Sequence, residues 1–317
     1  MSMENFFVLF ITNLSYNSSM NDKKYWPDLS LLLLQVFWGA TFFIIKYAQD
    51  YISPVTLLAY RFLLGAVLMA ILLYFFQRKP LFKNFRQGFI LGFILCLAYI
   101  AQSTGLVYIS ASNSGFITGL FVIFVPLFSI LVLKKVPSIK NFIALAVSLI
   151  GLWILTGGVG QMNRGDLLTL VTAVTIAIHI LYTNKLIKNQ TDPYILNFQQ
   201  LFTVGILCLL VVVIFKQPLA IGSTKAIWAM LYLSIIAGVL GYLIQNLAQK
   251  YVPPLRVSVI FTTEAVFAAI FAWTLGREHF VPIQALGGLL IFIAMVLSEL
   301  PLEDWIFKKR LPAISVS

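Results

Sequence analysis

A single carboxylate, Glu264, lies in the middle of the long apolar stretch FTTEAVFAAIF, which covers residues 261–271. The other ten of the 11 Asp and Glu residues lie in connections or near the ends of apolar stretches. A charged side chain at the centre of a bilayer costs about 2.5–3.5 kcal/mol on insertion scales, so we expect Glu264 to face the protein interior. There it is either protonated or paired with a cation. Such a carboxyl group can carry a coupling proton or hold a cationic substrate; the structural alternative is a hydrogen bond that joins two helices.

Lys46, Arg61 and His179 also fall inside apolar stretches. Lys46 lies near the end of its stretch, and we expect it to extend to the membrane interface. Arg61 lies about eight residues, or roughly 12 Å of helical rise, into its stretch. It is the natural cation to pair with Glu264, although a side chain of this length can instead extend to the membrane interface. His179 lies in a run that has no other Asp, Glu, Lys or Arg between Asp166 and Lys185. It either titrates in a cavity or packs as a neutral, hydrogen-bonded imidazole.

Amides and aromatic rings complete the candidate cavity. Amides inside membrane spans commonly form hydrogen bonds between helices. Aromatic rings either form a stacking wall for an apolar or aromatic substrate or pack against lipid and core. Pro126, inside a span, removes a backbone hydrogen bond and is the expected hinge. The candidate cavity residues are Trp38, Arg61, Tyr99, Gln102, His179, Gln199, Tyr242, Gln245, Asn246 and Glu264.

The elements that must position these residues are membrane-spanning helices. The chain has 317 residues, of which 60% are hydrophobic and 10% charged, and its mean hydropathy is +0.94; soluble proteins carry about 25% charged residues. Stretches of about 20 apolar residues are long enough to cross the hydrocarbon. The expected fold class is an all-α polytopic membrane protein with ten transmembrane helices. The spans are expected at residues 29–48, 53–75, 88–107, 112–133, 139–156, 166–185, 194–215, 226–249, 255–275 and 282–299.

The net charge is +11, and the distribution of the basic residues along the chain indicates the membrane topology. With the N-terminus inside, only four of the 22 Lys and Arg fall in outer connections and two within spans, which leaves sixteen on the cytoplasmic side. This bias predicts that both termini are cytoplasmic. No basic run has the interleaved aromatics of a nucleic-acid surface, so nucleic acid is not an expected partner. Cys96 and Cys208 lie in spans outside any metal-binding pattern, so we expect them to pack, with no metal and no cofactor.

The second half of the chain repeats the first. The segment YIAQSTGLVYI from Tyr99 aligns without a gap with YLIQNLAQKYV from Tyr242, so that Gln102 also faces Gln245. A unit of five spans is odd in number, so the second copy enters the membrane from the opposite side. Two inverted five-helix repeats of this kind enclose a cavity near the midplane, which is the architecture of many transporters.

Four segments carry a resemblance to a known family. WGATFFIIK and YRFLLGA in the first two spans, SGFITGLFVIFVPLFSILVLKKVPS from Ser114, and FTTEAVFAAIFAWTLGREHF from Phe261 resemble the EamA branch of the drug/metabolite transporter superfamily. The similarity extends over residues 25–300. Glu264 and Glu278 match the two glutamates of the last pattern, whereas Ala265 stands where proline is usual, which removes the family's reason for a helix break there. The resemblance implies a ten-helix exporter or exchanger of small metabolites, most often amino acids and related amphiphiles.

The repeat also sets the domain boundaries. Residues 1–28 are expected to be an N-terminal leader in which Met20 is the native start, because the apolar run FFVLFI is too short to span a bilayer and no basic region precedes it. The two EamA-like repeats are expected over residues 29–156 and 166–300. A basic cytoplasmic tail covers residues 301–317.

The expected function is secondary transport of small metabolites, such as amino acids or related amphipathic solutes, by alternating access across a bacterial inner membrane. Export is the expected direction and proton coupling one option; the protein is a monomer or a homodimer. The alternative is an exchanger or uptake carrier for a host- or environment-derived metabolite such as a nucleotide-related or sulfonium compound. The sequence has no GxxxxGK[ST] loop for direct use of ATP. A membrane enzyme needs more acids and histidines than this chain places together, and a channel or scaffold is the third class.

Overall fold

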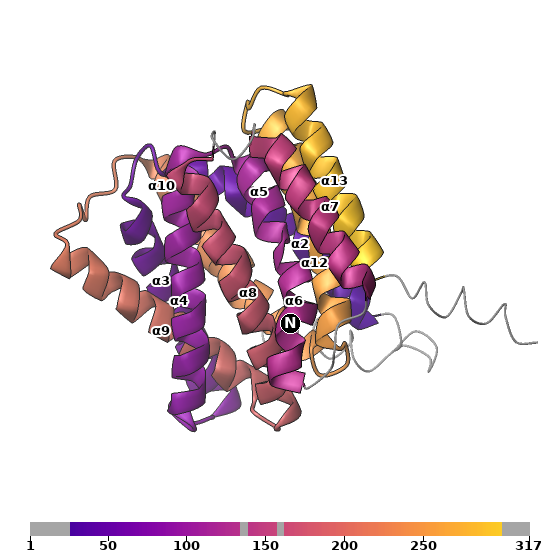
Figure 1. Ribbon diagram of the computed structural model, residues 1–317. Coiled ribbons are helices and arrows are strands. Elements are labelled where there is room, and N and C mark those ends of the chain that lie inside the picture. Colours follow the sequence, from indigo (N-terminus) through magenta and orange to yellow (C-terminus); the bar gives the residue numbers. More distant parts are fainter. Residues whose placement is uncertain (1–25, 134–138, 157–161, 300–317) are drawn as a thin grey trace, which may run out of the picture.

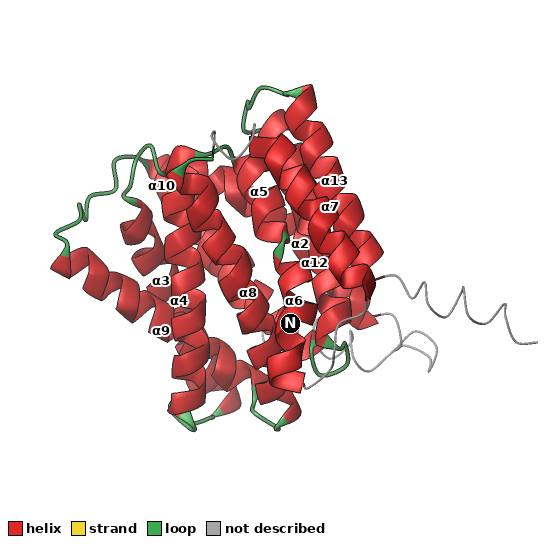
Figure 2. Cartoon of the chain, viewed as in Figure 1, coloured by secondary structure: helices red, strands yellow, loops and turns green. Residues whose placement is uncertain are grey.

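The computed structural model describes residues 26–133, 139–156 and 162–299 (Figure 1). Every regular element within these residues is a helix (Figure 2). The predicted start at Met20, most of the predicted leader and the tail over residues 301–317 lie outside the described residues.

In the described part of the chain ten helical spans follow one another, as the hydropathy predicts. Eight are long and apolar enough to cross a membrane, and two shorter apolar helices, over 143–156 and 282–294, complete the set. The elements are α2 (Trp26–Ala48), α3 (Pro54–Ile71) continued by the π-helix η2 (Leu72–Gln77), α4 (Phe85–Tyr108), α5 (Ala111–Gly119) with α6 (Phe121–Leu133), α7 (Ile139–Thr156), α8 (Arg164–Lys188), α9 (Pro193–Ile214), α10 (Thr224–Tyr232) with η4 (Leu233–Leu240) and α11 (Gly241–Ala248), α12 (Pro254–Thr274) and α13 (Pro282–Glu299). The ten-helix polytopic fold is thereby confirmed.

Proline sets the start of several spans. Pro54, Pro193 and Pro254 occupy the first positions of α3, α9 and α12, where the missing N–H would have no partner within the helix. At α9 the preceding residue, Asp192, also caps the helix, because its Oδ1 accepts hydrogen bonds from the backbone N–H of Tyr194 at 2.9 Å and of Ile195 at 3.3 Å. These signals explain why the observed starts agree closely with those expected.

The two repeats interlock. Helix α3 packs along its equivalent α9, α7 along its equivalent α13, and α5 against its equivalent α12. Helix α4 of the first repeat contacts both α8 and α9 of the second, and α2 packs against α12. The group α3, α4 and α9 and the pair α7 and α13 lie on opposite sides of the molecule, with α5, α8 and α12 between them (Figure 1). The interface between the repeats therefore runs through the centre of the bundle.

The fourth span is interrupted at Leu120, between α5 and α6, and not at Pro126. Around the interruption the backbone tightens, because Leu120 N–H donates to Ile117 O at 3.2 Å and Ile123 N–H donates to Leu120 O at 3.0 Å. Such a short 3₁₀ stretch within a helix often marks a hinge. Pro126 lies inside the continuous helix α6, so its role as a hinge stays a prediction. Helix α12 runs without a break through Ala265.

Candidate functional site

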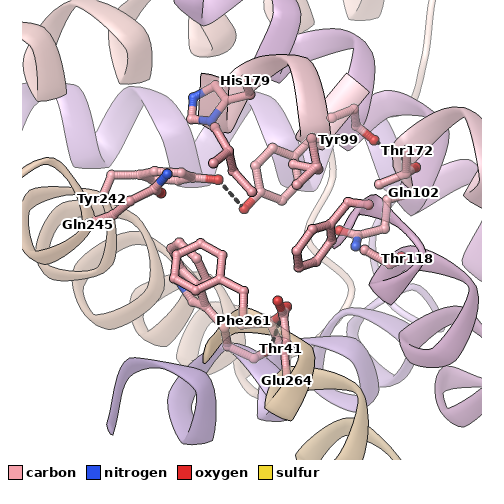
Figure 3. A pocket seen from close by; sticks show the side chains of 15 residues that line it. Thr41, Tyr99, Gln102, Thr118, Thr172, His179, Tyr242, Gln245, Phe261 and Glu264 are labelled. Atoms are coloured by element: carbon pink, nitrogen blue, oxygen red, sulfur yellow. Dashed lines mark hydrogen bonds between the residues drawn. The ribbon is translucent and has the colours of Figure 1, made fainter. Parts of the chain in front are cut away.

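A small cavity lies at the centre of the bundle, between the two repeats (Figure 3). Its free volume is about 40 Å³. Side chains from α2, α4, the α5–α6 region, α8, α11 and α12 form its wall. Seven of the ten residues predicted for a cavity line it: Trp38, Tyr99, Gln102, His179, Tyr242, Gln245 and Glu264. The remaining three, Arg61, Gln199 and Asn246, do not.

Glu264 lies midway along α12 and its carboxyl group points into this cavity, near Thr41 (Figure 3). Within the described ranges, its carboxylate oxygens have neither a hydrogen bond nor an ion pair. Its neighbours on the same helix, Thr262 and Thr263, instead donate to backbone carbonyls of α12. The carboxyl group is thus exposed to the cavity with its full bonding capacity available to a proton or a ligand.

Aromatic rings form a wall beside Glu264. The phenolic oxygens of Tyr99 and Tyr242 form a hydrogen bond of 2.6 Å. Trp38 packs against both Tyr242 and Phe261, with ring centroids 5.3 Å apart in each case. The indole N–H of Trp38 donates to Ala237 O at 2.9 Å, which fixes the orientation of the ring. These rings come from both repeats, so movement of one repeat relative to the other must rearrange this wall.

Arg61 lies outside the cavity and forms no ion pair with Glu264 in the described part of the chain. The side chain is 3% exposed. Its guanidinium carbon lies 4.4 Å from the ring centroid of Tyr99 and 4.6 Å from that of Phe62. This geometry gives cation–π attraction, while Nε and Nη1 have no hydrogen-bond partner among the described residues. Arg61 thus contacts the outer side of the tyrosine pair instead of the carboxylate.

His179 is held by a chain of amides that leads away from the cavity. Its Nε2 lies 3.1 Å from Gln200 Oε1. Gln200 donates to Asn197 Oδ1 at 3.3 Å, and Asn197 donates to Val239 O at 2.9 Å. The imidazole also packs edge-on against Tyr242, at 5.9 Å between centroids. The sequence-based list of site residues did not include Asn197 or Gln200; the polar run NFQQ within an apolar helix was the available signal.

The two predicted amides outside the cavity stabilise connections. Gln199 donates to Leu81 O at 3.0 Å and to Lys83 O at 2.8 Å, which ties α9 to the connection before α4. Asn246 donates to Pro193 O at 3.3 Å and so ties α11 to the start of α9.

Three threonines that the sequence did not single out line the cavity, namely Thr41, Thr118 and Thr172. The Thr41 hydroxyl donates to Trp38 O at 2.7 Å and the Thr172 hydroxyl to Ala98 O at 3.1 Å. Because each of these two hydroxyls bonds to a backbone carbonyl, it still offers an acceptor lone pair to the cavity. The Thr118 hydroxyl is buried with no partner in the described residues. Together they add small polar groups around Glu264.

Two charged residues bracket the short connection between α4 and α5. Lys46 donates to Leu106 O and Ile109 O, both at 2.7 Å, and so caps the last carbonyls of α4 instead of extending to the interface. Glu278 accepts from the backbone N–H of Ala111 and Ser112 and from the Ser112 hydroxyl. A carboxylate at a helix N-terminus is stabilised by the unpaired N–H groups there. Glu278 of the second repeat thus holds the start of α5 in the first.

Both repeats of the chain are similar to known proteins. The model of the EamA-like transporter family matches residues 25–157 and again residues 163–300, once for each repeat. A protein of Archaeoglobus fulgidus named "Uncharacterized transporter" is 31% identical over 280 residues, which cover 88% of this chain and 87% of its own. The "Uncharacterized transporter YyaM" of Bacillus subtilis is 27% identical over 282 residues, which cover 84% and 92%. A solved structure, "Crystal structure of protein", shares the fold with a TM-score of 0.65 at 14% identity, over 88% of this chain and 97% of that one.

Proposed function

The chain belongs to the EamA-like transporter family, and from this premise we propose that it moves small amphipathic metabolites, such as amino acids, out of the cell by alternating access. The protein is a multi-pass membrane transporter. The substrate binds in the cavity between the repeats, with a cationic group at Glu264 and an apolar part against the ring of Trp38. When no substrate is bound, a proton on Glu264 neutralises its charge.

The observation that carries this proposal is the position of Glu264. A carboxyl group without a partner in the described residues faces a small cavity at the interface of two inverted repeats. A polar wall with few groups, beside aromatic rings, is typical of sites for small organic ligands. An ionisable group at this depth is retained where it binds an ion, a proton or a substrate.

The small size of the cavity supports the proposal that the two repeats are closed around the site. A free volume of about 40 Å³ accommodates only a few water molecules, because each water molecule needs about 10–15 Å³ of such free volume. A metabolite of the size of an amino acid enters only after the lining helices separate. Separation of the repeats toward one face at a time would give the alternating access that inverted repeats support in other transporters.

Counterflow in proteoliposomes tests the proposal. A mixture of unlabelled amino acids is loaded inside, and uptake of the same radiolabelled mixture is measured. We expect the load to accelerate uptake by the wild type, and Glu264→Gln to reduce this uptake at least tenfold. Asp50→Asn, which removes an exposed carboxylate, is the matched control and should transport as the wild type does. Counterflow that is absent in the wild type, or undiminished in Glu264→Gln, would refute the proposal.

A further inference from the structure

Two cysteines from opposite repeats meet inside the bundle. Cys96 lies on α4 and Cys208 on α9, and their sulfur atoms are 3.8 Å apart. Both side chains are reduced and buried. Neither lines the cavity around Glu264. The proposed transport site therefore leaves this pair of thiols without a role.

The packing of α4 against α9 places the two sulfur atoms together. A Cβ atom at Gly88 would meet the side chain of Gln199, and one at Gly92 would meet Thr203. The absence of side chains at these two glycines lets the helices approach closely. The next turn of each helix carries Cys96 and Cys208 respectively. The close approach of the two helix backbones thus brings the thiols into contact. The contact does not require long, flexible side chains to bend toward each other.

A buried cation, Arg61, lies on α3, which packs against both cysteine-bearing helices, α4 and α9. Arg61 is 3% exposed, and its Nε and Nη1 have no hydrogen-bond partner in the described residues. A thiolate is the reactive form of cysteine, and a neighbouring cation stabilises it. A thiolate within reach of Arg61 would supply the acceptor that these two nitrogens lack in the described residues.

We propose that Cys96 and Cys208 are a reversible oxidation site that forms a disulfide between the two repeats. The S–S bond of a disulfide measures about 2.0 Å. The two sulfur atoms are now 3.8 Å apart, so they need to move closer by less than the diameter of one atom. The oxidant is a hydroperoxide. One thiolate attacks a peroxide oxygen, an S–O bond forms as the O–O bond breaks, and a hydroxide ion leaves. The second thiolate attacks the resulting sulfenic sulfur, the S–S bond forms as the S–O bond breaks, and a second hydroxide leaves. The two thiol protons convert both hydroxide ions to water.

The disulfide has a mechanical consequence that rests on the proposed function. Because α4 and α9 belong to different repeats, a covalent bond between them opposes any relative movement of the repeats at this level. Oxidation should therefore hold the transporter in its closed state, and reduction should release it.

Intact mass spectrometry tests the modification without any substrate. Purified protein is treated with hydrogen peroxide, denatured, and reacted with N-ethylmaleimide. We expect untreated protein to carry two maleimide adducts, and oxidised wild type to carry none until it is treated with dithiothreitol. The variant Cys96→Ser/Leu97→Cys moves the thiol to an exposed neighbouring position and should keep both adducts after oxidation. Two adducts on oxidised wild type, or loss of both adducts in this control, would overturn the proposal.

Counterflow then tests the consequence. Peroxide should lower counterflow of the wild type at least tenfold, with recovery after dithiothreitol, and should leave Cys208→Ser unaffected. A disulfide that forms by mass while counterflow persists would overturn the locking role. If the reduced wild type shows no counterflow at all, the proposed function fails, while the mass measurement still decides whether the disulfide forms.

Discussion

The phenolic oxygens of Tyr99 and Tyr242, which occupy equivalent positions in the two repeats, lie 2.6 Å apart and form a hydrogen bond. An inverted repeat brings equivalent residues together only near its internal axis, so this bond marks the place where the two halves meet. One side of the pair faces the cavity that contains Glu264, and Arg61 lies over the ring of Tyr99 on the other. Movement of one half of the protein relative to the other must therefore alter the hydrogen bond between Tyr99 and Tyr242.

We expect Tyr99→Phe and Tyr242→Phe each to destabilise the closed protein by about 0.5–1.5 kcal/mol, the usual net contribution of one hydrogen bond. The double variant should lose little more than either single variant, because the bond is already broken. Unfolding in mixed micelles of the wild type, the two single variants and the double variant measures this coupling. Fully additive losses would show that the two hydroxyls act independently.

Asp192 and Lys79 form an ion pair of 2.7 Å that joins the connection before α4 to the start of α9. Burial raises the pKa of Asp192, but the hydrogen bond from Lys79 and those from the backbone N–H of Ile195 and Tyr194 outweigh it, so that the pKa lies below its ordinary value. A carboxyl group whose pKa is lower in the folded state stabilises the fold above its unfolded pKa of about 3.9. That contribution disappears as the pH falls through the folded pKa.

Asp192→Asn keeps an acceptor for the helix cap but removes the charge. We expect it to lower the free energy of unfolding by about 0.2–1 kcal/mol at pH 7, because the pair is partly exposed, and by progressively less as the pH falls below about 4. Unfolding measured across this range, with the exposed Asp50→Asn as control, tests the sign. A loss that grows toward low pH would contradict the ion-pair account.

The distribution of Lys and Arg predicts that both termini are cytoplasmic, and labelling can test this prediction. Asn189, between α8 and α9, and Ala220, between α9 and α10, are both exposed and lie in successive connections. We expect a membrane-impermeant maleimide to label Ala220→Cys in intact cells, and Asn189→Cys only after permeabilisation. The native cysteines are buried and should contribute little labelling. The opposite pattern would invert the topology.

The helices and the repeat were predictable because their signals are local. Apolar length and proline at the first helical turn locate the spans, and the ungapped alignment pairs Tyr99 with Tyr242, whose hydroxyls form a hydrogen bond in the structure. The family match to each repeat confirms the two-repeat fold. The direction of a side chain around its helix was harder to predict. Gln199 and Gln200 are adjacent and differ by about 100° in direction, yet only Gln200 bonds to His179.

Tertiary packing decided the other differences between the expected and observed sites. The depth of Arg61 in its span predicts that it pairs with Glu264, but it packs on aromatic rings that come from its own helix and from α4. The threonines of the cavity were missed because a threonine in a helix commonly bonds its own backbone, as Thr41 does. The helix interruption at Leu120 could not be predicted from the sequence, because no proline stands at this position.

In the proposed transport cycle, the cavity beside Glu264 opens to each side of the membrane in turn. Thr118 lines this cavity, is 4% exposed, and has a hydroxyl without a partner in the described residues, so Thr118→Cys is a conservative probe. Thr183 is equally buried, and its hydroxyl also has no partner in the described residues, but it does not line the cavity; Thr183→Cys is therefore the matched control. Both variants are made in a background with Cys96→Ser and Cys208→Ser.

The decisive measurement is the reaction of Thr118→Cys with a membrane-impermeant methanethiosulfonate, applied to right-side-out and to inverted vesicles. We predict that the reagent modifies this cysteine in both preparations, and Thr183→Cys in neither. Modification of Thr118→Cys from one side only, or from neither side, would contradict alternating access through this cavity.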